Sequence, residues 1–358
     1  MRAPASVSVH RLRAGRSVRL FGAALAAAIG MLLLPLRTDA ATPPDRIWFC
    51  PGPGTLDYLR LFENPNQWTH ARQAMSVFKF YQQHTQMPPD RIVGPNTYDA
   101  LVRVDAFRTL TQWGKKIGIE VAAVKDYYCT PDASGMTAAI NATAASVRAV
   151  QTAGGTVSYL AMDEPFVSGR GRVCGGPALE PTADRVGTYV SGVRAAFPDV
   201  KIGLIEAYPF SSADALVAVL QLLKERNATP AFLHMDVDWH LAGSPAFLRD
   251  MARLKNVSAT AGIPFGIIVT GYNGDADSLY AVDAYGITEL IAQTFSSWDS
   301  MPDHLIVQSW AVSSSGLLVT PSNLPEDVRY THTNMLFDVY RRLRGASGPA
   351  RGGAVRKH

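Results

Sequence analysis

Carboxyl groups stand at the ends of several strand-like stretches of this 358-residue chain. One or two acids close each of the stretches at 119–126, 157–163 and 200–207, and two more lie within 232–239. Two neighbouring carboxyl groups can divide acid and base work, because one keeps its proton while the other stays ionised. Cleavage of a glycosidic bond uses such a pair. The candidate catalytic acids are Glu164, Asp238, Glu206 and Asp236.

Eight strand-like segments, each followed by a helical stretch, are the elements that must position these acids. The segments span 46–50, 76–81, 119–126, 157–163, 200–207, 232–239, 265–270 and 305–310. The helical stretches span 66–75, 96–118, 136–150, 182–197, 212–226, 244–254, 277–295 and 334–343. Eight such repeats predict an α/β fold, a single-domain (β/α)8 TIM barrel. Active sites of such barrels lie where strands pass into loops, so the acids are expected at one mouth.

Alternation along a strand predicts which side chains face the barrel interior. On the sixth strand Asp236 and Asp238 share one face with His240 at the rim, while apolar residues occupy the other face. The same reasoning turns Glu164 and Glu206 inward on the fourth and fifth strands. Acids from three strands are therefore expected to converge at a similar height.

A short motif carries a family resemblance. Asp163-Glu164-Pro165, at the end of the fourth strand, resembles the Asn-Glu-Pro of the large retaining clan of barrel glycoside hydrolases. The resemblance implies that Glu164 is the proton donor and that Asp163 holds a sugar hydroxyl. Trp310, which closes the eighth strand, is similar to the Trp that floors the sugar subsite in that clan.

The chain departs from the clan at the seventh strand. There the clan has a nucleophilic Glu, whereas residues 269–273 read Val-Thr-Gly-Tyr-Asn and contain no carboxylate. The second acid is therefore expected to be Asp238, Asp236 or Glu206. Similarity to other barrel glycosidases, which pair acids on strands four and six, favours Asp238.

Sugar rings stack on flat apolar faces, and aromatic and polar residues accompany the acids. Lys79 and Lys125 have a second interpretation, in which a lysine inside the barrel neutralises Asp126 or Asp236 in a buried ion network. The expected substrate-binding residues are Asp163, Lys79, Asp126, Tyr127, Tyr208, Trp239, His240, Tyr272 and Trp310.

Two other functions remain open from the sequence. A barrel without the strand-seven nucleophile suits a non-catalytic glycan-binding protein. Metal-dependent hydrolysis would need His234, Asp236, Asp238 and His240 to share an ion, but a strand spreads these residues over about 20 Å. Neither a metal nor a cofactor is therefore expected.

The first 40 residues predict that the protein is exported from the cytoplasm. Six Arg accompany an apolar run at 20–36, and small residues precede Ala41, as in a secretory signal peptide cleaved after Ala40. An uncleaved anchor is the alternative, although seventeen residues are short for about 30 Å of hydrocarbon. We expect a secreted or periplasmic protein that is not inserted in the membrane after cleavage, with a barrel catalytic domain at 41–344 and a disordered tail at 345–358.

Charge and cysteine content complete the predictions. Removing the signal's six Arg and one Asp from 34 basic and 30 acidic residues leaves a net charge of about −1. No clustered basic face is present for nucleic acid, so the expected partner is an oligo- or polysaccharide bound by a monomer. Cys129 and Cys174 are placed to pair at one end of the barrel, and Cys50 is expected to be buried and free.

Overall fold

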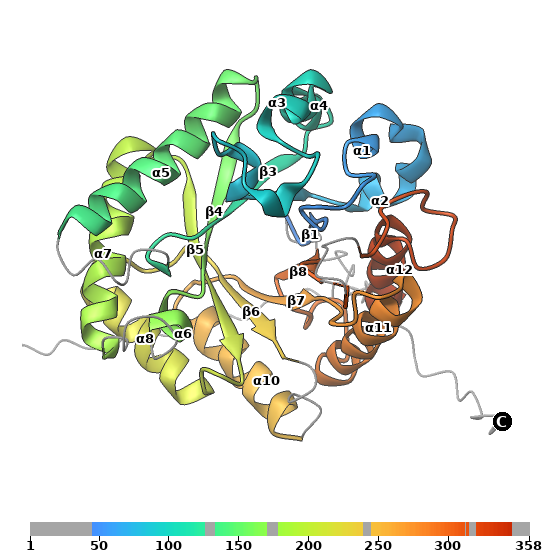
Figure 1. Ribbon diagram of the computed structural model, residues 1–358. Helices are drawn as coiled ribbons and strands as arrows, with labels where there is room; N and C mark the ends of the chain where they lie inside the picture. Colours follow the sequence, from blue (N-terminus) through green and yellow to red (C-terminus); the bar gives the residue numbers. More distant parts are fainter. Residues whose placement is uncertain are drawn as a thin grey trace, which may run out of the picture. The chain divides into compact units, whose positions relative to one another are not determined.

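The computed structural model describes residues 45–125, 133–169, 178–238, 245–311, 313–314 and 320–345. Eight parallel strands form a closed barrel in chain order, with helices around it (Figure 1). The predicted (β/α)8 TIM barrel is thereby confirmed. The strands are β1 (Ile47–Cys50), β2 (Val77–Tyr81), β3 (Lys116–Val121), β4 (Val157–Asp163), β5 (Lys201–Tyr208), β6 (Leu233–Val237), β7 (Phe265–Val269) and β8 (His304–Gln308).

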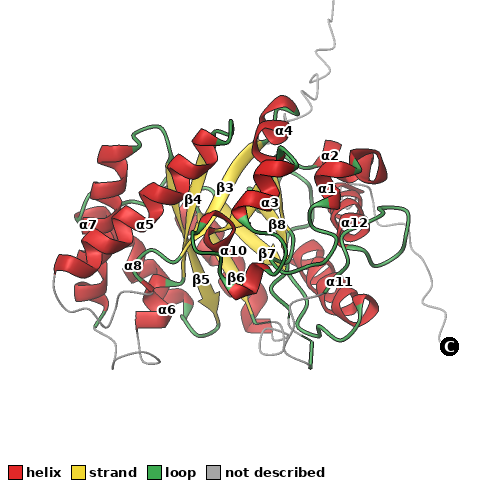
Figure 2. Cartoon of the chain, turned by 45° about the horizontal axis from the view of Figure 1, so that its top comes forward, coloured by secondary structure: helices red, strands yellow, loops and turns green. Residues whose placement is uncertain are grey.

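Helices follow every strand and cover the outside of the barrel (Figure 2). Among the described helices, none has the length and apolarity needed to cross a membrane. After β1 and β2 come α1 (Arg60–Glu63), η1 (Pro65–Trp68), α2 (Thr69–Ala74), η2 (Gln82–Thr85), η3 (Arg91–Val93), α3 (Tyr98–Arg103) and α4 (Ala106–Gln112). The later strands are followed by α5 (Ala133–Thr152), α6 (Pro165–Gly169), α7 (Leu179–Ala196), α8 (Ala213–Glu225), α10 (Pro245–Thr260), α11 (Asp277–Thr294) and α12 (His332–Gly345).

Large rings fill the lower part of the barrel interior. The ring of Trp48 lies 4.7 Å from that of Tyr159 and 5.4 Å from that of Phe232, measured between centroids. Ile268 and Ile306 pack into the same inner cluster. These packed rings close the barrel interior below the C-terminal ends of the strands, and the imidazoles of His234 and His304 pack against them.

The predicted helix at 96–118 is wrong in two places. Asp105 adopts a left-handed backbone (φ 54°) between α3 and α4, and Gly114 (φ 67°) ends the helical part. Gly118, expected to terminate the helix, lies within β3, where a Cβ atom would stand 3.3 Å from Trp48. A strand glycine here makes room for the packed rings. The third strand therefore begins at Lys116, earlier than predicted, and Glu120 lies near its C-terminal end.

The inward faces predicted for β4 and β5 are also wrong. Leu160, Met162 and Leu204 belong to the outer core against the helices, whereas Tyr159 and Ile205 line the interior. Both faces of these strands are apolar, so alternation alone gives no direction. On β6 the predicted alternation is confirmed, because its apolar residues pack outward and its polar ones face inward.

Candidate active site

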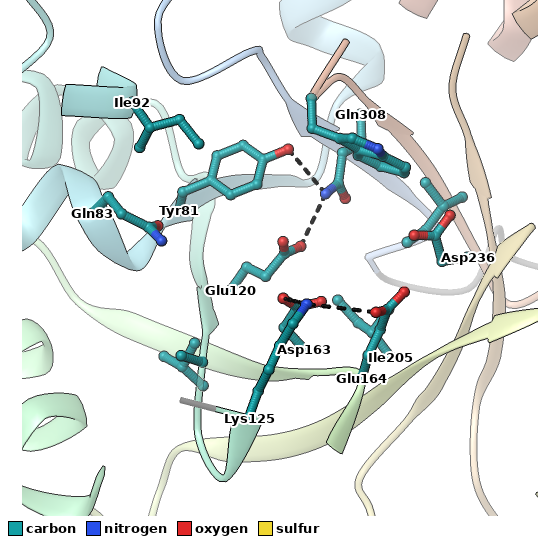
Figure 3. A pocket seen from close by; sticks show the side chains of 14 residues that line it. Tyr81, Gln83, Ile92, Glu120, Lys125, Asp163, Glu164, Ile205, Asp236 and Gln308 are labelled. Carbon is teal, nitrogen blue, oxygen red and sulfur yellow. Dashed lines mark hydrogen bonds and ion pairs between the residues drawn. The ribbon is translucent and has the colours of Figure 1, made fainter. Parts of the chain in front are cut away.

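A pocket of about 370 Å³ opens at the C-terminal ends of the strands (Figure 3). Every strand from β2 to β8 contributes to its wall. Active sites of (β/α)8 barrels occupy this end. The lining residues are Tyr81, Gln83, Ile92, Glu120, Val121, Ala122, Lys125, Asp163, Glu164, Ile205, Asp236, Ile268, Gln308 and Trp310.

Four carboxyl groups point into this space: Glu120, Asp163, Glu164 and Asp236. Asp163 and Glu164 are adjacent in sequence, so regular alternation would send one of them outward. Glu164 instead adopts a left-handed backbone (φ 45°), and both side chains line the pocket. That conformation costs a non-glycine residue about 1–3 kcal/mol, and such strain gathers at functional sites.

Lys125 joins the adjacent pair. Its Nζ lies 2.7 Å from Asp163 Oδ2 and 3.5 Å from Glu164 Oε2. Burial disfavours the charge of Lys125, but the two carboxylates outweigh that effect and raise its pKa. Burial, followed by the charge of Glu120, raises the pKa of Asp163 to about 7 despite the contact with Lys125.

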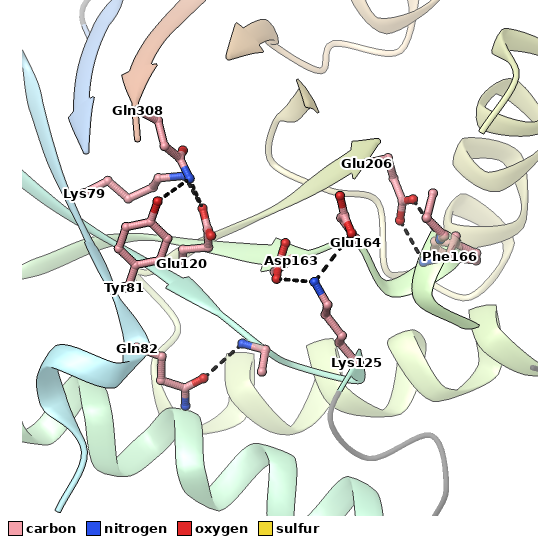
Figure 4. Close-up of polar contacts among 12 residues, drawn as sticks. Lys79, Tyr81, Gln82, Glu120, Lys125, Asp163, Glu164, Phe166, Glu206 and Gln308 are labelled. Carbon is pink, nitrogen blue, oxygen red and sulfur yellow. Dashed lines mark hydrogen bonds and ion pairs between the residues drawn. The ribbon is translucent and has the colours of Figure 1, made fainter. Parts of the chain in front are cut away.

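An ion pair and a hydrogen bond hold Glu120 in place (Figure 4). Its Oε2 accepts from the ammonium of Lys79, which is fully buried, and from Gln308 Nε2 at 2.9 Å. Gln308 Nε2 also donates to Tyr81 Oη at 3.1 Å. Lys79, expected to bind substrate, is absent from the pocket lining and forms a buried ion pair, as in the alternative interpretation, although its partner is Glu120.

Asp236 contrasts with the other three acids. No hydrogen bond joins its carboxyl group to any residue in the described part of the chain. Burial raises its pKa well above the ordinary value, and the charges of Glu164, Asp163 and Glu120 add to the effect. The carboxyl group of Asp236 therefore faces the pocket in surroundings that favour its protonated form.

Two of the predicted site residues point away from the pocket. Glu206 is fully buried, and its carboxyl group accepts from the backbone N–H of Phe166 (2.8 Å) and Val167 (3.1 Å) at the start of α6. Tyr208 packs among the helices and donates to Asp250 Oδ2 at 2.8 Å. Both lie on the outward face of β5, so the expectation that they line the barrel mouth is wrong.

Other predicted residues lie near the rim. Asp238 follows the last residue of β6 and does not line the pocket, and Tyr272 donates to the carbonyl of Val237 at 2.6 Å. Trp310 does line the pocket, and Cys50 is buried and free as predicted. Asp126, Tyr127, Trp239, His240, Cys129, Cys174 and the tail after residue 345 fall outside the described residues.

Glu206 provides a pH-dependence prediction. Burial raises its pKa from 4.5 to about 8. Between these values the folded protein holds a proton that the unfolded chain has lost. The contribution of Glu206 to the free energy of unfolding is therefore complete below about pH 4.5 and falls as the pH rises toward 8. Each pH unit in that window lowers the free energy of unfolding by about 1.4 kcal/mol.

Glu206→Gln removes this titration. Urea unfolding at pH 6 and pH 9 should show a smaller loss of the free energy of unfolding for the variant than for the natural protein. Parallel losses in the two proteins would contradict the prediction.

Of the potential metal ligands of the sixth strand, the structure describes His234, Asp236 and Asp238, and these three are not arranged around one ion. His234 Nε2 lies 2.9 Å from His304 Nδ1 deep in the barrel, and burial, with the charges of His304 and Lys79, keeps the pKa of His234 well below its usual value. Across the described residues, no group of three His, Cys, Asp or Glu side chains is placed to hold a metal.

Comparison with known proteins concerns the fold. No protein-family model and no curated protein match the sequence. A psychrophilic glycoside hydrolase family 10 endo-β-1,4-xylanase aligns with a TM-score of 0.53 and 12% identity over 84% of this chain and 98% of its own. The fold is similar to that of barrel glycoside hydrolases. The family 53 catalytic domain of Ignisphaera aggregans aligns with a TM-score of 0.51 and 10% identity over 84% of this chain and 96% of its own. An endo-β1,6-glucanase aligns with a TM-score of 0.53 and 10% identity over 84% of this chain and 77% of its own.

These solved structures support the predicted similarity of the fold to barrel glycoside hydrolases. At 10–12% identity they establish a common architecture, and the reaction must be argued from the pocket.

Proposed function

We propose that this protein is a glycoside hydrolase and that Glu164 and Asp236 are its catalytic pair. The observation that carries the proposal is a pocket at the C-terminal end of the barrel in which two acids have different electrostatic surroundings. Glu164 lies beside the ammonium of Lys125, whereas Asp236 has no cationic partner among the described residues and a raised pKa. An acid whose surroundings favour its protonated form is suited to donate a proton, and we assign the acid beside the ammonium group as its partner.

The chemistry follows from those environments. Asp236 donates its proton to the glycosidic oxygen, and the carboxylate of Glu164 attacks the anomeric carbon or takes a proton from water. This order reverses the roles implied by the clan resemblance, in which Glu164 is the donor. Asp163 remains the group proposed to hold a sugar hydroxyl, and Trp310 supplies an apolar face for the ring.

A second candidate is a non-catalytic barrel that binds glycan. The observation in its favour is at β7, which contributes Ile268 to the pocket wall and no carboxyl group. A barrel of the retaining clan would carry its nucleophile at the end of that strand.

A panel of oligosaccharides separates the two candidates. Isothermal titration measures binding, and a reducing-end assay on the same mixtures measures cleavage. We expect at least one glycan to bind and to yield new reducing ends. Binding without product would support the non-catalytic candidate, and the absence of both would contradict the two candidates together.

Export is part of the proposal. The charged start, the apolar run at 20–36 and the small residues before Ala41 support a secretory signal. Mass spectrometry of the protein recovered from periplasm or medium should give a chain that begins at Ala41. A chain that retains residues 1–40 would contradict cleavage at this point.

A further inference from the structure

The amide of Gln308 leaves an unmatched acceptor at the pocket. Gln308 is 2% exposed, and its Nε2 donates to Tyr81 Oη and Glu120 Oε2. The hydroxyl proton of Tyr81 is committed to the carbonyl of Ser309 at 2.7 Å, so both neighbours of the amide can only accept. This arrangement fixes the amide orientation. Gln308 Oε1 is then buried without a hydrogen-bond donor.

Two further groups offer acceptors in the same pocket. Both hydrogen bonds to Glu120 reach Oε2, which leaves Oε1 without a donor among the described residues. The carboxyl group of Asp236 has no hydrogen bond in the described part of the chain. A ligand bound here therefore meets acceptor atoms on several sides.

The charge balance agrees with the acceptor pattern. Four carboxyl groups line the pocket, and within the described ranges the ammonium groups in contact with them are those of Lys79 and Lys125. A metal cation would need three ligands placed around one point, and no such group exists among the described residues. Donors for the unmatched acceptors of Gln308 and Glu120 are thus better supplied by an organic cation that spans the pocket.

An ammonium group has the required properties. It carries three donors and no acceptor, together with a positive charge. The rings of Tyr81 and Trp310 line the same pocket, and aromatic faces attract cations. A sugar hydroxyl brings an acceptor along with its one proton, and an acetamido group brings a carbonyl oxygen against Gln308 Oε1 and Glu120 Oε1, which can only accept.

We propose that the sugar unit bound in this pocket carries a free amino group, so that the substrate is a glycan of amino sugars without N-acetyl groups. This inference rests on the proposed glycoside hydrolase function and specifies its substrate class. The amine sits against Gln308 and Glu120, and the ring lies on the aromatic wall.

A matched set of oligosaccharides tests the proposal. The probes are oligomers of D-glucosamine and D-galactosamine, their N-acetylated forms, and the corresponding neutral glucose and galactose oligomers. Isothermal titration with the purified protein, at a mildly acidic pH where the amines are charged, should show an amine oligomer binding about tenfold or more tightly than its matched neutral and N-acetylated forms. Added salt should reduce that preference.

A pair of variants locates the amine. Glu120→Gln keeps the shape of the side chain and removes the pocket carboxylate beside Gln308, so we expect most of the preference for the amine to disappear. Asp238→Asn removes a carboxylate that does not line the pocket and should keep the preference. Thermal unfolding of both variants checks that each is folded.

The outcomes separate this inference from the proposed function. Equal binding of the amine and neutral oligomers, or no binding of any amine, overturns the amino-sugar assignment, even if neutral glycans are cleaved. Preferential binding of an amine oligomer without new reducing ends supports the assignment and contradicts the hydrolase.

Discussion

Glu164→Gln is expected to lower kcat/KM for glycan hydrolysis by about 10²–10⁴-fold, the usual range for loss of an acid or base group. The neutral amide can neither attack the anomeric carbon nor take a proton from water. It has the same shape and retains an oxygen that can accept from Lys125, whose Nζ lies 3.5 Å from the carboxylate. The loss should therefore fall on kcat, while KM and the thermal midpoint change little.

The matched control is Glu289→Gln, which makes the same chemical change on α11, where Glu289 pairs with Arg342 on the surface. Steady-state kinetics and thermal unfolding of the two variants should differ only in kcat. A Glu164→Gln protein that keeps full turnover would remove Glu164 from the mechanism, and a protein that unfolds at ambient temperature would assign the residue a structural role.

Lys79→Met is expected to destabilise the fold by about 3–5 kcal/mol, the usual cost of removing one partner of a buried ion pair. The ammonium of Lys79 is completely shielded from solvent and contacts Glu120. Without it, the hydrogen bond from Gln308 is the one that Glu120 keeps among the described residues, and Glu120 must hold a buried charge or take up a proton. Urea unfolding at neutral pH measures the loss.

Two further proteins make this result interpretable. Lys224→Met removes an exposed lysine from α8 and should change the free energy of unfolding by less than about 0.5 kcal/mol. The double variant Lys79→Met with Glu120→Met replaces the whole pair by apolar groups and should recover much of the loss. A single Lys79→Met variant as stable as the natural protein would show that the pair has no structural role.

The sequence predicts the barrel well because its signals repeat. Eight apolar segments alternate with helical stretches, and on β6 polar and apolar residues alternate clearly enough to turn Asp236 inward. The same rule fails on β4 and β5 because Tyr159 and Leu160 are both apolar, and only packing decides which of them meets the helices.

The site was predicted less completely, for local reasons. Glu120 and Gln308 were missed as pocket residues. Glu120 was placed at the wrong end of its strand, although the glycine at 114, just after Trp113, was a helix-stop signal that would have moved the strand boundary. Glu164 reaches the pocket because its backbone is left-handed, and no pattern of residues in the sequence predicts that conformation. The outward position of Glu206 depends on the start of α6, a contact made only in the folded chain.

The packed rings of Trp48, Tyr159 and Phe232 limit how a ligand can enter and leave the pocket. Because the pocket above these rings is closed at its inner end, the proposed glycan substrate has no route along the barrel axis. A polymeric glycan would lie across the opening or insert a terminus or branch, and the cleaved fragments would leave through the same opening. If the proposed hydrolysis takes place, product and substrate compete for this opening, and short fragments are expected to inhibit turnover.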